Sequence, residues 1–389
     1  MKEKIVSDLL QAVAFFFLNP IFIMALLAAV LLGYYRVKRE RRSFNIRLLP
    51  GLTELKLLVS ESLFYAFILS VVILVTGLVV DPGWLVLFVV AAMIALITFY
   101  YKIASPIYFA AGAFIALYFL GEYASGFTYL GWVAGKVDLF GELAITVPVI
   151  AGLLLVVEGR LINRYVAQNA SPFFMNTKRG LQAVAYKGKR LWLLPVLFLI
   201  PGDMISAYVP YWPQFTLGET LFTFVPVPII IGFSQVARST YADLLFPKMG
   251  RAIALVGVVV IAVGFAALWM PMLGWAALGI GVAGRAIISI QTAVGQRIGA
   301  FAVAPISKGV VIAGIIPNSP AEKMGLVTGE CIRAVNGRQV SNEKELYAAI
   351  QVNAAHCRLQ VLGRDGEVRL MQQVIFRHDH HRLGLLVVR

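Results

Sequence analysis

The four histidines of the chain are the residues best suited to hold a catalytic metal or to act as a general base, and all lie near the C-terminus. A zinc protease of the membrane needs His-Glu-x-x-His on one helix, because two imidazoles bind the metal and the carboxylate activates water. A serine protease needs a histidine beside its nucleophile. No histidine precedes His356, so the long apolar part of the chain has neither arrangement and both classes are excluded.

Acidic residues offer two further kinds of site. An aspartyl protease of the membrane needs two facing aspartates, and Pro201-Gly202-Asp203 is similar to one half of such a site, but no second aspartate lies within a predicted span. The run His378-Asp379-His380-His381 has metal-binding residue types, yet without a second group of ligands a solvated loop is the favoured interpretation. We therefore predict a non-enzymatic protein with no catalytic residue, no metal and no cofactor.

The composition indicates a polytopic α-helical membrane protein. Of the 389 residues, 60% are hydrophobic and 14% are charged, whereas about 25% of residues in soluble domains are charged. Nine apolar segments are long enough to be spans. The prediction is eight or nine helical spans, because the first segment is interrupted by Asn19-Pro20 and need not cross fully. The segments are 9–35, 57–80, 84–101, 104–120, 139–157, 191–209, 216–236, 252–270 and 272–290.

The loops between these segments differ strongly in charge. One alternating set, at 36–56, 102, 160–190 and 238–251, is rich in Lys and Arg, and the internal turns of the other set hold only Lys136. Because positive loops stay on the cytoplasmic side, we expect the basic set and the chain after the last span in the cytoplasm. Nine spans place the N-terminus outside, and eight place it inside. The net charge of +14 is explained by topology and membrane lipid rather than by nucleic acid.

Four charged residues lie in or near the predicted spans: Glu61, Asp203, Glu219 and Arg285. Charged groups inside a bilayer are costly and often functional. Most of the four are close to a predicted span end, where we expect the side chain to reach the interface. Prolines at 195 and 201 interrupt the sixth span, which keeps a transporter with broken helices as an alternative.

The pattern changes after a transmembrane domain at 1–290 and a short linker at 291–297. Residues 298–389 have the pattern of a small α+β domain, with β-branched strands at 310–316 and 329–335 and a tight Asn336-Gly337 turn. Asn342 and Glu345 have capping-box spacing at the start of a helix that runs to about residue 352. Further strands are predicted on either side of Arg364-Asp365-Gly366, and 383–388 is a candidate for a last one. Cys331 is expected to be a small buried hydrophobe, and a disulfide is not expected.

The motifs of this segment resemble those of a bacterial PDZ domain. Ser319-Pro320-Ala321, Gly325-Leu326 and Asn336-Gly337 keep the expected spacing. The resemblance implies that a peptide adds as a strand beside the residues before Gly309, with its side chains against a helix. Since 297–303 lacks a clear Tyr-Leu-Gly-Ile pattern, both a free C-terminus and an internal strand remain possible ligands. The expected peptide-binding residues are Ile298, Gly299, Ala300, Phe301, Val303, Leu346, Ala349 and Ile350.

The whole chain resembles the MinJ-type membrane proteins of Gram-positive division-site selection. The resemblance rests on the run Phe15-Phe16-Phe17-Leu18-Asn19-Pro20, a polytopic body of this length and one C-terminal PDZ domain. It implies a scaffold in the bacterial cell membrane, enriched at septum and poles, that bridges DivIVA to MinD and the inhibitor MinC and contacts divisome components. The alternatives are a membrane adaptor for a protease or secretion system, and a transporter with a regulatory PDZ domain.

Overall fold

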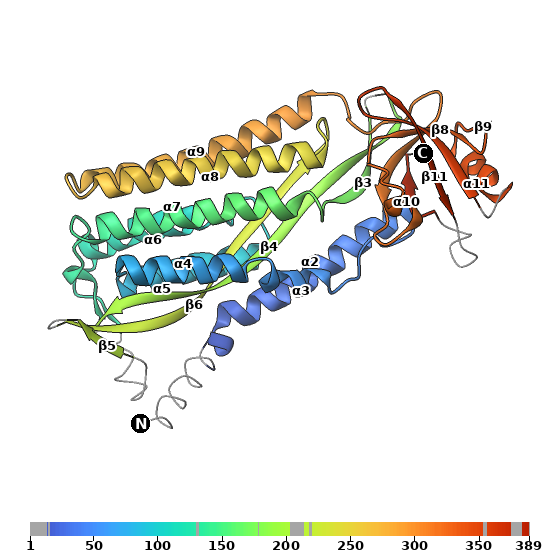
Figure 1. The fold of residues 1–389 in the computed structure, drawn as a ribbon. Helices are drawn as coiled ribbons and strands as arrows, with labels where there is room; N and C mark the ends of the chain where they lie inside the picture. The colour runs from blue at the N-terminus through green and yellow to red at the C-terminus, as the bar shows by residue number, and fades with distance from the viewer. Residues whose placement is uncertain are drawn as a thin grey trace.

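The computed structural model describes residues 14–388 except 15, 130–131, 178, 203–213, 218–219, 353–355 and 375–382. Figure 1 shows an elongated helical body, a long β-ribbon that runs obliquely along it, and a small α+β unit at one end. The ribbon and helix α2 both lead toward that unit.

The body consists of apolar helices. Among the described residues, six helical stretches are long and apolar enough to cross a membrane, and α5 is a shorter apolar helix. This confirms a polytopic helical body, while the count of eight or nine spans stays a prediction. The helices are α2 (Pro20–Phe44), α3 (Thr53–Ser60), α4 (Leu63–Thr76), α5 (Pro82–Thr98), α6 (Pro106–Tyr123), α7 (Leu143–Leu161), the π-turn η2 (Ile162–Val166), α8 (Ala242–Ala266) and α9 (Met272–Ile298).

Local sequence explains where several helices begin. Asn19 caps α2 by accepting a hydrogen bond from the Ile21 N–H at 3.0 Å, and Pro20 occupies the first helical position, where its missing N–H costs nothing. Asp81 and Pro82 start α5 in the same way. Asn19-Pro20 is therefore the point at which α2 begins, and α2 continues through the basic residues expected in a loop, as far as Phe44.

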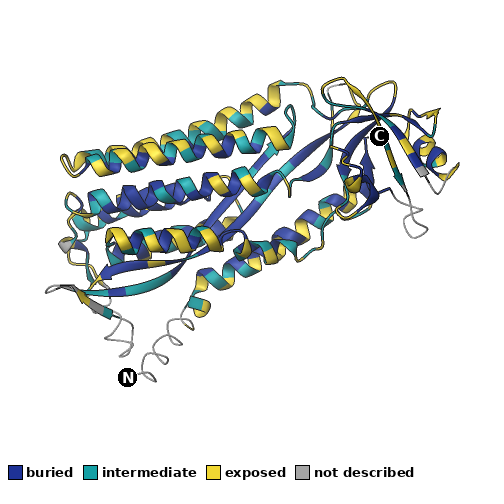
Figure 2. Cartoon of the chain, viewed as in Figure 1, coloured by how far each residue is buried: buried dark blue, intermediate teal, exposed yellow. Residues whose placement is uncertain are grey.

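Glycines allow α7 and α8 to approach backbone to backbone. A Cβ on Gly159 would collide with the backbone of Gly250, and a Cβ on Gly152 would collide with Gly257. Small residues at such crossings let membrane helices pack closely. In Figure 2 the exposed residues follow the outer faces of α8 and α9, whereas the ribbon strands are mostly buried.

Two of the expected helical spans are strands. Residues in 191–209 and 216–236 belong to β4 (Gln182–Pro201), β5 (Gln214–Leu217) and β6 (Thr220–Ala237). β4 and β6 pair antiparallel from Tyr186↔Ala237 to Pro201↔Phe222. With β3 (Ser171–Asn176) they form the sheet β3-β4-β6-β5. A small hairpin, β1 (Thr128–Tyr129) and β2 (Trp132–Val133), leads into the 3-10 turn η1 (Ala134–Lys136).

Prolines explain how this ribbon can lie in an apolar body. Backbone N–H groups without partners are not tolerated in hydrocarbon. Pro195 of β4 is directly opposite Pro228 of β6, and since neither has an N–H, this must be a pair whose N–H positions point away from the partner strand. Pro201 and Pro226 lie an even number of residues from Pro195 and Pro228, so their N–H positions also point away from the partner strand. The four prolines therefore remove donors from the two outer edges of the ribbon.

The helices satisfy other outward groups of the ribbon. Three bonds come from α4 and the residues that flank it, and one bond comes from the turn before α6. These bonds run from Leu197 N–H to Ser70 Oγ (3.0 Å), from Ser62 Oγ to Leu193 O (2.7 Å), from Val80 N–H to Leu199 O (3.0 Å) and from Gly232 N–H to Ala104 O (2.7 Å).

Buried charges pair inside the body instead of reaching the interface. Arg285 of α9 is 2% exposed and its guanidinium lies 2.8 Å from the carboxylate of Glu158 on α7, which is fully buried. The hydroxyls of Ser105 and Ser289 complete this cluster. The expectation that Arg285 snorkels is therefore wrong. Asp203 and Glu219 lie outside the described residues.

The C-terminal unit is a sheet with two helices. The Asn336-Gly337 turn has φ of 51° and 82°, and Glu345 N–H donates to Asn342 Oδ1 at 2.9 Å, so the predicted turn and the Asn342 cap are confirmed. The Glu345 carboxylate accepts from Ser341 N–H at 2.7 Å. The sheet order is β11-β10-β8-β7-β12, with β9 on β8. The elements are β7 (Val310–Ile315), α10 (Pro320–Lys323), β8 (Cys331–Val335), β9 (Arg338–Gln339), α11 (Glu343–Val352), β10 (His356–Leu362), β11 (Val368–Val374) and β12 (Leu385–Val387).

The expected linker at 291–297 is helical, because α9 continues to Ile298. Gln296 fixes this helix end, since its Oε1 accepts hydrogen bonds from the backbone N–H groups of 238–240 at 2.8–3.2 Å. The C-terminal unit then docks directly on the body. The Tyr186 hydroxyl donates to Ala313 O at 2.6 Å, and Val184 N–H donates to Val303 O at 2.9 Å.

Candidate peptide-binding groove

β12 forms one edge of the C-terminal sheet. It pairs antiparallel with β7, with Leu385 opposite Ile315 and Leu386 opposite Gly314. Among the described residues no strand pairs with its second edge. Gly384 O accepts from Ile316 N–H and Val388 N–H donates to Val311 O. By alternation, the backbone groups of Leu385 and Val387 point away from β7, which is the arrangement that an added strand requires.

A groove of about 280 Å³ lies along this edge. Its walls are β12 and one face of α11, where Glu343, Tyr347 and Gln351 follow one another at four-residue spacing. The membrane body supplies a third wall through Phe44, the last residue of α2, and Ile46 just after it. The groove is therefore a composite of the C-terminal unit and the body.

Gly384 makes the start of β12 possible. Its φ is +85°, a left-handed conformation that side chains disfavour. A Cβ there would also collide with Ser319. Ala321 N–H donates to Leu383 O at 3.0 Å, so the segment Leu383-Gly384-Leu385 is held against the start of α10.

The helix residues expected to contact a peptide lie beside the groove but inside the core. Leu346, Ala349 and Ile350 are 0%, 4% and 5% exposed and pack in the centre of the C-terminal unit. The residues that line the groove lie on the adjacent helix face. The sequence pattern therefore predicts the helix, but it does not predict which residues of that helix line the groove.

The strand side of the expected groove is found elsewhere. Ile298 ends α9 and is 80% exposed, and Gly299 packs on Ser239. The Arg238 guanidinium lies 4.4 Å from the centre of the Phe301 ring. Ala300 lies between these residues, and Val303 is buried against Val184 of β4. The structure thus brings 298–303 to the end of the ribbon, and β12 takes the position beside α11. The sequence signal for β12 as the strand beside α11 is Leu383-Gly384-Leu385, a glycine between two apolar residues inside a candidate strand.

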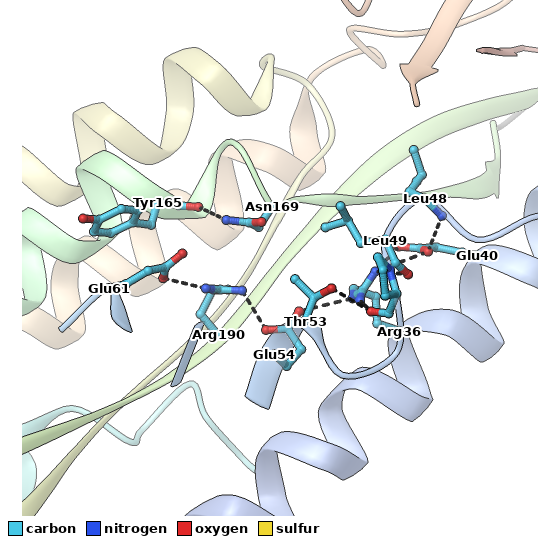
Figure 3. Close-up of polar contacts among 11 residues, drawn as sticks. Arg36, Glu40, Leu48, Leu49, Thr53, Glu54, Glu61, Tyr165, Asn169 and Arg190 are labelled. Atoms are coloured by element: carbon cyan, nitrogen blue, oxygen red, sulfur yellow. Dashed lines mark hydrogen bonds and ion pairs between the residues drawn. The ribbon is translucent and has the colours of Figure 1, made fainter. Parts of the chain in front are cut away.

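Five buried charges form a continuous network that runs from α2, whose last residue lines the groove, to β4 and the end of α3 (Figure 3). Positive and negative groups alternate along it: Glu40, Arg36, Glu54, Arg190 and Glu61. The N···O distances are 3.2, 3.2, 2.7 and 2.5 Å in that order, and no member is more than 7% exposed. Trp192 Nε1–H also donates to Glu61 at 2.7 Å. Glu61 is therefore paired in the interior, and the expectation that it reaches the interface is wrong.

The network also fixes the chain segment that carries Ile46. Leu48 N–H donates to Glu40 Oε2 at 2.9 Å, and Arg36 donates to Pro50 O at 2.7 Å. Phe44 packs on Phe174 of β3 with ring centres 4.5 Å apart. The body wall of the groove is thus held on both sides of Ile46.

The opposite side of the C-terminal unit is also anchored. Arg364, in the turn between β10 and β11, pairs with Asp243 of α8 at 2.7 Å and lies 3.8 Å from the centre of the Tyr241 ring. Thr328 O accepts from the same guanidinium at 2.7 Å. These contacts fix the orientation of the unit, and hence of its groove, relative to the body.

The two cysteines are buried, free thiols. Cys331 of β8 is 3% exposed, as predicted, and Cys357 of β10 is fully buried. Burial raises the pKa of Cys357 to about 11 and also raises the pKa of Cys331. In the described part of the chain no three His, Cys, Asp or Glu side chains converge as a metal site. The run 378–381 lies outside the described residues.

Comparison with known proteins supports both parts of this architecture. A PDZ domain model matches residues 311–362. The cell division topological determinant MinJ of Bacillus subtilis (strain 168) is 31% identical over 98% of this chain and 95% of its own length. A probable MinJ of Lacticaseibacillus paracasei is 27% identical over 65% of this chain and 68% of its own length. The magnetosome formation protease MamE of Paramagnetospirillum magneticum is 41% identical over 85 residues, 21% of this chain and 12% of the protease.

Proposed function

The chain belongs to the MinJ family of cell division topological determinants, and from that premise we propose that it is a non-enzymatic membrane scaffold for division regulators. Its proposed partners are a DivIVA-like polar scaffold, a MinD-like regulator and through it MinC, with further divisome components. The chain is proposed to concentrate at septum and poles.

The observation that carries this proposal is the open edge of β12 beside α11. A partner segment that adds to this edge gains main-chain hydrogen bonds from Leu385 and Val387, and its side chains enter the groove beside Tyr347 and Gln351. The interaction needs no catalytic group. It supplies a connection between the membrane body and a partner, which is what a scaffold requires.

The body contributes by confining the groove to the membrane plane. Such tethering raises the effective concentration of a membrane-bound partner without tighter contacts. The PDZ unit is proposed to face the cytoplasm, because it contacts the basic segments: Ile46 lines its groove and Asp243 pairs with it. Segments rich in Lys and Arg stay on the cytoplasmic side.

No specific observation favours either alternative, a membrane adaptor for a protease or secretion system or a transporter with a regulatory PDZ domain. The similarity to the MamE protease covers 12% of that protein. The transporter alternative depends on Pro195 and Pro201 as breaks in a helical span. Both prolines lie in β4, where they remove donors from the ribbon edge rather than interrupt a helix.

The test uses the full chain in cells and in purified form. The double variant Tyr347→Ala/Gln351→Ala removes two groove side chains, of which Tyr347 is half-buried and also packs against the core of the unit. Lys344→Ala changes an exposed residue of the same helix. We expect the double variant to lose co-purification of its partner and to misplace septa, while it inserts and folds normally. The Lys344→Ala control should behave as the parent chain does.

Retention of the partner by the folded double variant would exclude the groove as the binding site. The membrane body would then be the binding surface. Misplaced septa in the Lys344→Ala control would equally count against a role specific to the groove.

A further inference from the structure

We propose that a second cavity of the body, between α2, the end of α5 and β4, binds the phosphate of an anionic phospholipid. The cavity has a volume of about 490 Å³. It is separate from the peptide groove and shares none of its lining residues. The cations on its wall that argue for an anion are Arg39, Lys187 and Lys189.

These three cations converge from two elements. Arg39 lies on α2, and Lys187 and Lys189 lie two residues apart on β4, so their side chains leave the same face of the strand. Lys189 Nζ donates to Phe99 O at 3.1 Å and lies 4.6 Å from the centre of the Tyr101 ring. Arg39 Nε is buried and has no hydrogen-bond partner.

The nearby carboxylates are already engaged. Glu54 lines the cavity, but its two oxygens lie 3.2 Å from Arg36 and 2.7 Å from Arg190. Among the described residues, none of the three cations has a carboxylate within 4.0 Å. Like charges gathered in a half-buried cavity repel one another, and an anion in the cavity relieves that repulsion.

The rest of the wall identifies a lipid as the source of the anion. Leu31 and Tyr35 of α2 and Ile97 of α5 line the same cavity and are 40%, 56% and 68% exposed. Both helices belong to the apolar body, where exposed aliphatic side chains face acyl chains. α5 ends one residue after Ile97, which is where an apolar helix meets the headgroup layer. The cavity therefore offers cations to a headgroup and aliphatic side chains to its tails.

The experiment compares the full chain in nanodiscs of phosphatidylcholine alone with nanodiscs that also hold phosphatidylglycerol. Lipid retained on the protein is measured by native mass spectrometry, and unfolding is followed by heating. We expect phosphatidylglycerol to be retained and to raise the melting temperature. Arg39→Gln/Lys187→Gln should weaken retention about tenfold or more, since each surface cation contributes about 1 kcal/mol to binding of anionic lipid.

The matched control is Lys38→Gln/Arg41→Gln, which removes the same charge from exposed positions of the same helix. It should change retention less than about threefold, because neither side chain lines the cavity. Equal losses in both double variants would overturn the proposal, because they would indicate a diffuse charge effect.

Two outcomes that would overturn the proposal are measured on the parent chain alone. If phosphatidylglycerol neither binds nor stabilises it beyond phosphatidylcholine, the proposal is wrong, whatever happens to the variants. If inorganic phosphate alone stabilises the parent chain and displaces the lipid, the cavity is a site for a free anion rather than for a phospholipid, and the lipid assignment is overturned.

Discussion

Pro195 and Pro228 face each other across the β4–β6 ribbon, at a position where both N–H groups would point outward into the helical body. The pair removes two donors from the edges of the ribbon within the apolar body. It also explains why a two-stranded ribbon can replace a helical hairpin in an apolar sequence: its edges are closed partly by prolines and partly by side chains and backbone of the surrounding helices.

Restoring one of these N–H groups should destabilise the body. Pro195→Ala and Pro228→Ala each create a buried donor without a partner, which costs about 1–3 kcal/mol. We expect a lower melting temperature for the full chain in detergent. Pro82→Ala is the matched control, because the N–H at the first position of α5 has no helical partner in any case. An equal loss in all three variants would assign the effect to proline stiffness alone.

The charge network predicts a large effect at its centre. Glu54→Ala leaves Arg36 and Arg190 buried without their shared carboxylate, and breaking such a pair costs about 3–5 kcal/mol. Asp243→Ala removes the exposed partner of Arg364 and should cost less than about 1 kcal/mol. Thermal unfolding of the two variants distinguishes these cases. Similar melting temperatures would show that the buried network adds no more than a surface pair.

The composite groove predicts that the membrane body affects partner binding. Ile46→Ala removes apolar surface from one wall of the groove and should weaken partner binding by about 1 kcal/mol, or roughly fivefold. Leu52→Ala, an exposed position of the same connecting segment, is the control. The measurement is the affinity of the purified full chain, in detergent, for the proposed DivIVA-like or MinD-like partner. Unchanged affinity in the Ile46 variant would restrict the site to β12 and α11.

Leu346→Arg is expected to unfold the PDZ unit, because the substitution places a charge at a fully buried position. Loss of partner binding in that variant would say nothing about the groove. Circular dichroism or limited proteolysis should reveal the unfolding directly, and a folded Leu346→Arg chain would contradict the core assignment.

The thiols provide a labelling test. Only thiolates alkylate readily, and burial raises the pKa of Cys357 to about 11. We expect neither native cysteine to react at pH 7 or 8 until the sheet is unfolded. Lys344→Cys adds an exposed thiol on α11 that should react at once. In intact cells a membrane-impermeant reagent should reach it only after permeabilisation, if the unit is cytoplasmic.

The elements that the sequence predicted correctly are those whose signals are local. The Asn336-Gly337 turn and the Asn342 cap each depend on a few neighbouring residues, and both are present. The ribbon could not be distinguished from helices in this way, because a continuous apolar run is compatible with either a buried helix or a buried strand. Its only local sign was the spacing of Pro226 and Pro228, which places both at the same edge.

The strand that lies beside α11 could not be predicted for a different reason. The helix α11 was found from its own periodicity, but its partner strand is chosen by long-range pairing. The PDZ resemblance pointed to 298–303, whereas β12 reaches β7 from the far end of the chain. The buried charges were likewise invisible, since Glu61 and Arg190 are 129 residues apart in sequence.

The hydrogen bonds that join Val184 to Val303 and Tyr186 to Ala313 bear on genetic dissection of this protein. A truncation that ends near residue 290 would leave the tip of the ribbon and its tyrosine hydroxyl without partners, in addition to removing the groove. The phenotype of such an allele would combine loss of peptide capture with damage to the membrane body. Point substitutions on the groove-facing side of α11 separate the two effects.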